Sequence, residues 1–536
     1  MSKIIKYGDE ARKILKVGVD AVANATKITI GPKGRNVVFD RGFGGPTITN
    51  DGDSIAREIV LKDPLENIGG NICKEVAQKT NDSAGDGTTT SLVLMQSIVE
   101  EGMKKISLGI NAIGMKNGIE KASKIAVKYL KSVSKPIKND EETIQVATIS
   151  SESRETGEII ASTIKELGSD SVITVEEGQT TGIVSEIAQG MEFEKGYVSP
   201  YMVTDPNRAE AICKNVSILV TDLKIRGVDE IKNLVETVLA SGKQELVVIA
   251  EDITGGALNA FILNKLRGGL ITLAIKAPGF GARKKDYLED IAAVVGATFI
   301  SSELDMSLNN VTLEHLGSAD KVISSKDKTT IVGGNGTKEE LDNRISLAKD
   351  ELGKLESKHD KLKVEERIAR LSGGVAIIKV GAATETETKY LKLKIEDAVN
   401  AVKSALEEGI VAGGGSSLIS AGKAVQKAKM DESLTEDERI GFDILSIALE
   451  APLKNIAINC GGGDGSLVVS KVKEMEELGG YDALNDEYKE NMIEAGIIDP
   501  VKVARSAVEN AVSAGSVLLT MECAMAEEPK DKQDIL

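Results

Sequence analysis

The chain has 536 residues, of which 41% are hydrophobic and 28% charged, and its formal net charge is −17. This length exceeds what one hydrophobic core organises, so we expect several domains. A net negative charge repels a phosphate backbone, and no apolar run approaches the ~20 residues that span a bilayer, so neither nucleic acid nor a membrane is expected as a partner.

The first ten residues are charged where a secretory signal needs an apolar core, and they lack the Arg-rich bias of a transit peptide. We therefore expect a cytoplasmic protein. The four cysteines, Cys73, Cys213, Cys460 and Cys523, are far apart and predict buried, reduced thiols. With only two histidines in the chain, chemistry here must depend on carboxylates, hydroxyls, lysines or the backbone.

Both ends of the chain have helical patterns, whereas the middle alternates short β-branched runs with amphipathic helices. We expect helices at residues 20–28, 89–105, 396–408 and 500–525, and strands at 172–175, 246–249 and 271–275. Residues 338–371 are charged, with leucines at helical spacing, and predict a solvated helical hairpin.

Proline and glycine mark candidate joints on both sides of the middle segment, at Ser134–Pro136, Gly190, Gly373–Gly374 and Gly409. This nesting favours a multi-domain α/β fold. An α/β domain would be inserted, through a small connector, into a mainly helical domain that both chain ends form.

Two loops suit phosphate, although the chain has neither a Walker A motif nor a GxGxxG motif. In the first loop, Thr29–Asn36, Gly31 and Gly34 let backbone amides converge on an anion, and Lys33 and Arg35 add positive charge.

The second loop, Asp82–Ser91, places Asp86 just before a predicted helix. Helix-start amides and the hydroxyls of Thr88, Thr89 and Thr90 suit phosphate, and Asp86 suits the Mg²⁺ that accompanies ATP. Each loop alone is more often only a capped turn.

Further glycine turns and carboxylates strengthen the nucleotide interpretation. Asp51-Gly52-Asp53 follows a third glycine-rich turn, and Glu396-Asp397 precedes the glycine-rich run 407–415. Together with the two loops they favour a nucleotide.

At these residues the sequence resembles the group I chaperonins, the bacterial GroEL-type sixty-kilodalton family, from about Tyr7 to Ala526. The most specific segments are Ile30–Val38, Gly85–Thr90, Lys276–Gly281, Leu371–Ala383 and Ala405–Gly415. The resemblance implies an ATPase that binds non-native polypeptides and encloses them, under a small co-chaperonin lid, in a tetradecamer of two stacked heptameric rings. It also implies three domains: equatorial (1–133 and 409–536), intermediate (134–189 and 375–408) and apical (190–374).

The resemblance also implies roles for individual residues. Asp397 would orient the attacking water with help from Asp51, and Asp86 would hold Mg²⁺; K⁺ is a further expected cofactor. The other implied nucleotide-site residues are Thr29, Ile30, Gly31, Pro32, Asn50, Gly87, Thr88, Thr89, Thr90, Ile149, Gly414, Asp482, Ala483, Leu484 and Asp499.

Two apolar stripes at helical spacing, within 228–239 and 258–266, are by themselves typical of a core. The resemblance instead implies an exposed apolar rim that binds substrate and lid. Its residues would be Tyr197, Ser199, Tyr201, Met202, Ile231, Leu234, Val235, Leu258, Ile262 and Leu263.

Three positions depart from the family pattern: Asn50 and Asp482 at the expected nucleotide site, and Lys232 on the first stripe. Other hypotheses stay open. They are a group II chaperonin, a small-molecule phosphotransferase that uses the same Asp and Thr loop, and a nonenzymatic scaffold.

Overall fold

The computed structural model describes residues 2–40, 46–168, 172–178, 180–206, 208–279, 281–304, 306–355, 358–461 and 463–528. Contacts divide the chain into two compact units. Unit 1 comprises Met1–Lys165, Glu177–Ile183 and Val380–Leu536, and unit 2 comprises Glu166–Glu176 and Val184–Lys379. The predicted mixed α/β class is confirmed, and the division into three domains stays a prediction.

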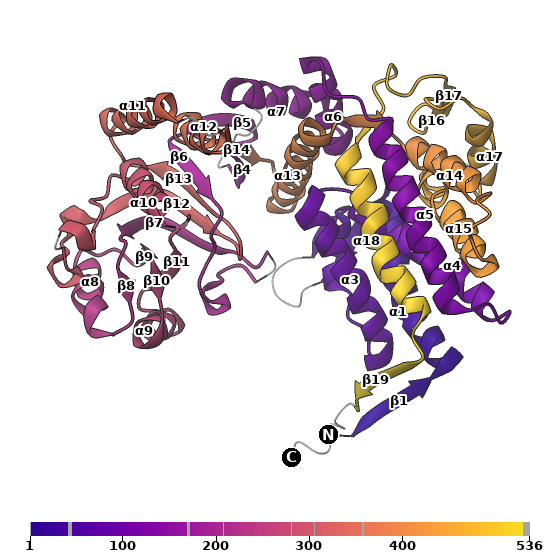
Figure 1. Cartoon of the computed structure of the whole chain (residues 1–536), viewed down its shortest axis with the longest axis horizontal. Helices are drawn as coiled ribbons and strands as arrows, with labels where there is room; N and C mark the ends of the chain where they lie inside the picture. The colour runs from indigo at the N-terminus through magenta and orange to yellow at the C-terminus, as the bar shows by residue number, and fades with distance from the viewer. Residues whose placement is uncertain are drawn as a thin grey trace. The chain divides into compact units, whose positions relative to one another are not determined.

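Unit 1 is mainly helical (Figure 1). Its helices are α1 (Gly8–Thr26), α2 (Gly52–Glu58), α3 (Pro64–Ala84), α4 (Thr88–Ile106), α5 (Ala112–Ser132), α6 (Asp140–Ser151), α7 (Arg154–Leu167, whose last turn lies in unit 2), α13 (Glu385–Glu408), α14 (Ser416–Ala428), α15 (Glu436–Ala448), α16 (Ala451–Asn459), α17 (Ser466–Glu474) and α18 (Val501–Leu519). One buried cluster combines residues from both chain ends, among them Val19, Met95, Leu130, Leu445 and Val508. Helices α4, α5 and α18 pack together in this core.

The helices expected at both ends exist, with one correction. Residues 523–525, which we expected to be helical, belong to strand β19 (Cys523–Glu527). This strand pairs antiparallel with β1 (Lys3–Tyr7), so the first and last described elements lie side by side (Figure 1). Alternate side chains of β19 are buried, and this period of two fits a strand better than a helix.

Glycines allow α1 and α3 to pack closely. A Cβ atom at Gly18 would overlap the carbonyl oxygen of Glu66 and lie 2.7 Å from the amide nitrogen of Gly70. A Cβ atom at Gly69 would likewise overlap the carbonyl of Leu15. Only glycine fits at these crossing points.

Short two-stranded ribbons complete unit 1. They pair β2 (Val37–Phe39) with β3 (Thr47–Thr49), β15 (Ile410–Ala412) with β18 (Ile498–Pro500), and β16 (Gly480–Asp482) with β17 (Glu487–Lys489). Strands β4 (Val172–Glu177), β14 (Val375–Gly381) and β5 (Gly182–Ala188) form a sheet in the order β4-β14-β5. The chain passes between the units at the end of α7 and within these three strands.

Unit 2 contains a six-stranded sheet in the order β11-β9-β7-β12-β13-β6. The strands are β6 (Gly190–Phe193), β7 (Ala211–Val220), β9 (Glu245–Ala250), β11 (Ile271–Lys276), β12 (Gly317–Ser324) and β13 (Thr329–Gly334). Strands β7, β9 and β11 are parallel, and the remaining pairs are antiparallel. The runs 246–250 and 272–275 are buried throughout, as a sheet covered on both faces requires.

Helices α8 (Asp229–Ala240), α9 (Gly255–Leu266) and α10 (Ala282–Val295) also belong to unit 2. Helices α11 (Lys338–Lys354) and α12 (Lys358–Gly373) contact each other, which confirms the predicted helical hairpin. The strands predicted at 172–175, 246–249 and 271–275 are also present.

Cys73 and Cys213 are buried and Cys460 is partly buried, as free thiols. The prediction of burial is wrong for Cys523, which is exposed because its side chain lies on the open face of the β1–β19 ribbon. Within the described part of the chain, every helix is too short or too polar to cross a membrane.

We expect Gly18→Ala to lower the thermal unfolding midpoint by several degrees, because the added methyl group forces α1 and α3 apart at a cost of about 1–3 kcal/mol. Gly353→Ala is the control, since a Cβ atom there meets nothing within 4 Å and alanine favours a helix. Equal midpoints for Gly18→Ala and the parent protein, measured by calorimetry, would contradict this packing.

Candidate functional site

A cavity of about 590 Å³ in unit 1 collects the residues predicted for the nucleotide. Its lining includes all eighteen: Thr29, Ile30, Gly31, Pro32, Asn50, Asp51, Asp86, Gly87, Thr88, Thr89, Thr90, Ile149, Asp397, Gly414, Asp482, Ala483, Leu484 and Asp499. These residues come from segments up to 470 positions apart in the chain. The fold therefore brings both predicted phosphate loops to one place.

The two loops contact each other directly through threonine hydroxyls. Thr29 Oγ1 lies 3.3 Å from Thr89 Oγ1 and also donates to the carbonyl of Thr26 at 2.8 Å. Asn459 Nδ2, at the end of α16, donates to the carbonyl of Ile30 at 2.9 Å and holds the first loop in place. Lys33 and Arg35 are exposed and are not among the described lining residues, so the charge expected from them is not in the cavity.

Helix α4 starts at the cavity with an uncapped N-terminus. Gly87 precedes the helix with φ +82°, in the left-handed region that favours glycine, and no side chain accepts a bond from the first turn. Thr88, Thr89 and Thr90 form that first turn. Helix-start amides carry partial positive charge, so this end of α4 together with its hydroxyls suits a phosphate group.

Helix α13 packs on the turn between α3 and α4. A Cβ atom at Gly85 would overlap the side chain of Asn400, and Ser404 Oγ donates to the carbonyl of Ala84 at 2.9 Å. Asp397 lies one turn before Asn400 on the same helix. This close contact therefore brings Asp397 to the start of α4.

Three carboxylates line this end of the cavity. Asp51 caps α2, with its oxygens 3.1 Å from the amide of Asp53 and 3.0 Å from that of Ser54. The carboxylate of Asp86 accepts hydrogen bonds from the amide of Gly87 (2.5 Å) and from Ser150 Oγ (3.2 Å). Burial and then the charges of Asp51 and Asp86 hold the pKa of Asp397 well above its usual range.

This crowding of negative charge suits a divalent cation, whose charge would relieve the repulsion. Among the described residues no three His, Cys, Asp or Glu side chains converge as a complete metal site. Mg²⁺ ordinarily uses one or two carboxylates and completes its shell with water and phosphate oxygens. The donor set around Asp86 therefore fits Mg²⁺ that arrives with a phosphate ligand.

One cation at the cavity, Lys394, was not among the residues predicted from the sequence. Lys394 lines the cavity one turn before Asp397, and its Nζ lies 2.7 Å from Glu152 Oε1. Thr148, Ser150 and Glu152, at the end of α6, were also missed. The i, i+3 spacing of Lys394 and Asp397 was the available signal for the lysine, and Ile149, which the resemblance implied, was the signal for its neighbours at the end of α6.

The other end of the cavity has a buried carboxylate and apolar walls. Burial and the charge of Asp86 raise the pKa of Asp499 to about 7, although the amides of Gly414 and Gly415 partly offset the effect. Asp482 bonds its own turn, accepting from the amides of Leu484 (3.1 Å) and Asn485 (3.2 Å). Ile149 and Leu484 add exposed apolar surface on which a flat ring can stack.

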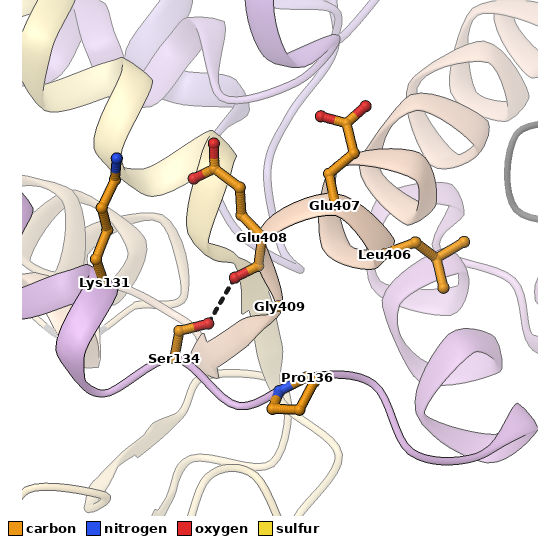
Figure 2. A pocket seen from close by; sticks show the side chains of 7 residues that line it. All are labelled: Lys131, Ser134, Pro136, Leu406, Glu407, Glu408 and Gly409. Atoms are coloured by element: carbon orange, nitrogen blue, oxygen red, sulfur yellow. Dashed lines mark hydrogen bonds between the residues drawn. The ribbon is translucent and has the colours of Figure 1, made fainter. Parts of the chain in front are cut away.

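A second, open cavity of about 550 Å³ lies elsewhere in unit 1, where residues 131–136 meet the end of α13 (Figure 2). Ser134 Oγ donates to the carbonyl of Glu408 at 2.6 Å, as the dashed line shows. The carboxylates of Glu407 and Glu408 pair with Lys502 and Arg505. Because these charges are already compensated, this cavity does not match the predicted nucleotide chemistry.

Several residues of the predicted apolar rim in unit 2 are buried, which corrects that expectation. Ile231, Leu234, Met202 and Ser199 are buried. Ile231, Leu234 and Met202 belong to the core that α8, α9 and the sheet share, and Met202 Sδ accepts from the amide of Ala274 at 3.2 Å.

The rest of the predicted rim reaches the surface to different extents. Tyr201 is 69% exposed and Leu263 is 48% exposed, whereas Tyr197, Val235, Leu258 and Ile262 are half-buried. Three apolar residues outside the predicted rim are also exposed: Val228, which directly precedes α8, Leu239 on α8 and Leu266 on α9.

Comparison with protein families identifies a relationship over most of the chain. A sequence model of the TCP-1/cpn60 chaperonin family covers residues 22–529 of the chain. The matched region contains all of the cavity lining and both apolar helices of unit 2.

The raised pKa of Asp499 predicts a pH-dependent effect on stability. The folded state holds this proton up to about pH 7, whereas the unfolded chain releases it near its ordinary pKa of 3.8, so stability from this group is lost as pH rises between these values. We expect Asp499→Asn to increase the free energy of unfolding, relative to the parent, by about 1–3 kcal/mol more at pH 8 than at pH 5.

Urea titrations at the two pH values measure this difference. Glu490→Gln, which neutralises an exposed acid in the same unit, is the control and should give the same small effect at both. An Asp499→Asn effect of one size at both pH values would contradict the raised pKa.

Proposed function

The chain belongs to the TCP-1/cpn60 chaperonin family, and we propose that it is a group I chaperonin that hydrolyses ATP at the cavity of unit 1 to drive protein folding. The family supports a role in protein folding, its members are ATPases that generally use ATP with Mg²⁺, and it implies polypeptide binding and ring assembly.

One observation carries the nucleotide proposal. A single cavity combines the uncapped start of α4, three threonine hydroxyls and the carboxylates Asp51, Asp86 and Asp397. Phosphoryl transfer to water needs alignment and charge neutralisation more than covalent chemistry. Helix-start amides, hydroxyls and carboxylates are the groups that supply both.

Each part of the cavity has a proposed role. Thr29–Pro32 and Gly87–Thr90 bind the phosphates, Gly414 and Asp499 face the ribose, and Ile149 with 482–484 borders the adenine. Mg²⁺ held by Asp86 supplies charge neutralisation on the phosphates. Asp397 accepts a hydrogen bond from the attacking water and orients it, and its raised pKa makes its carboxylate a stronger base that can take a proton as the reaction proceeds.

Polypeptide binding is proposed for the exposed part of the α8–α9 face. The apolar side chains there are the exposed Tyr201 and Leu263 and the half-buried Val235, Leu258 and Ile262. A surface of this kind can bind the apolar segments that unfolded chains expose and folded proteins bury. Binding of this kind is non-directional and therefore tolerates many sequences. A small co-chaperonin lid would bind the same face after ATP binding.

We expect Asp397→Ala to bind ATP with nearly unchanged affinity and to lose about 10-fold to 1,000-fold of its steady-state hydrolysis, because the water loses its orienting group. The measurement is phosphate release by the assembled protein with Mg²⁺. Glu387→Ala, which removes an exposed acid from the first turn of the same helix, should hydrolyse at the parent rate. Unchanged turnover in Asp397→Ala would remove this residue from the mechanism.

A double heptameric ring predicts a native mass of about 794 kDa, fourteen times the subunit mass of 56.7 kDa. Light scattering over a range of protein concentrations, with and without ATP, measures it. A mass near one subunit under all conditions would contradict the ring.

Stimulation of ATP turnover by unfolded protein would support the chaperonin, whereas turnover that is stoichiometric with a small acceptor would support a phosphotransferase.

A further inference from the structure

The cavity of unit 1 has a single cationic side chain among its described lining residues, Lys394. Its side chain is only 15% exposed, and its one ion-pair partner is Glu152, at 2.7 Å. Burial works against the charged ammonium, but the charge and hydrogen bond of Glu152 outweigh it, and the pKa of Lys394 is raised. Lys394 therefore carries a full positive charge at the edge of an acidic cavity.

Glu152 is held in an unusual backbone conformation. It ends α6 with φ +58°, a left-handed conformation that few residues other than glycine adopt. Its carboxylate is 42% exposed at the cavity lining, and Oε1 also lies 3.5 Å from Asn50 Nδ2. Strained residues of this kind persist where the surrounding structure holds them, and they concentrate at functional sites.

The position of Lys394 connects it to the phosphate end of the cavity. It lies one turn before Asp397 on α13 and lines the same cavity as Asp86, and its charge partly offsets the rise that burial causes in the pKa of both carboxyl groups. Asp86 in turn immediately precedes Gly87 and the uncapped start of α4. The positive charge of Lys394 therefore lies in the same cavity as the first-turn amides and hydroxyls of α4.

Charge balance makes this lysine a favourable partner for a triphosphate. Asp51, Asp86 and Asp397 already make this end of the cavity negative, and a terminal phosphate adds more negative charge. Glu152 carries a charge of the same sign as the phosphate and can be displaced by it, because its side chain lies partly in solvent and water hydrates the released carboxylate.

We propose that Lys394 binds the terminal phosphate of the nucleotide, and that Glu152 is a resident carboxylate which pairs with the lysine until that phosphate displaces it. This proposal rests on the proposed nucleotide function of the cavity. It makes the Lys394–Glu152 pair a competitor of ATP, and it gives the protein a way to bind ATP more tightly than ADP, which lacks the terminal phosphate.

The two partners of the pair should have opposite effects when they are substituted. Lys394→Met should weaken MgATP binding by about 10-fold or more and MgADP binding by less than about 3-fold, whereas Lys394→Arg should retain most of the ATP affinity. Glu152→Gln should tighten MgATP binding by about 2-fold to 10-fold, because the lysine no longer has an anionic partner, and should leave MgADP nearly unchanged.

Isothermal titration of the full-length, assembled protein with MgATP, under conditions where turnover is slow, and with MgADP measures these affinities. Lys389→Met is the matched control, since Lys389 pairs with Glu385 on the exposed part of the same helix. A pair with only a structural role would give weaker binding of both nucleotides in Glu152→Gln, and that result would overturn the proposal.

Two further outcomes separate this inference from the proposed function. If the parent protein binds neither nucleotide, the nucleotide function fails and the inference fails with it. If the parent binds both and Lys394→Met binds MgATP as the parent does, the inference alone is wrong.

Discussion

The contact between α13 and the turn that joins α3 to α4 determines the candidate site. Gly85 lets the Asn400 side chain approach the turn closely, and Ser404 fixes the approach with a hydrogen bond to Ala84. Because Asp86 follows this turn and Lys394 and Asp397 precede Asn400, one contact sets the distances among the charged groups. Any movement of α13 relative to α4 therefore changes binding and chemistry together.

Much of the cavity could be predicted from the sequence, because its phosphate-binding parts are local. Gly31, Gly87 and the threonines after Gly87 follow from the chemistry of a single turn. The contacts around these residues join distant parts of the sequence. For example, the carboxylate of Glu152 pairs with a lysine 242 positions away. Pairing of that kind depends on the tertiary fold, so neither Lys394 nor its partner had a sequence signal strong enough to stand out.

For the apolar face of unit 2, the sequence predicted the helices but not the exposure of their side chains. Helical periodicity identified which side of α8 is apolar, but it could not say which of those residues the sheet would cover. The structure buries Ile231, Leu234 and Val238 and leaves Val228 and Leu239 exposed on the adjacent side. The apolar stripe is wider than the core needs, and only this excess is available to a partner.

The antiparallel pairing of β1 with β19 has a consequence for how the chain folds during synthesis. The helical core of unit 1 combines residues from both sides of unit 2 in the sequence, so α18 and β19 are synthesised only after the whole of unit 2. Unit 2 is nearly continuous in sequence and has all of its strands by residue 379. Unit 2 can therefore fold while the chain is growing, whereas α4 and α5 of unit 1 must wait for their partner α18, which begins more than 300 residues after α5 ends.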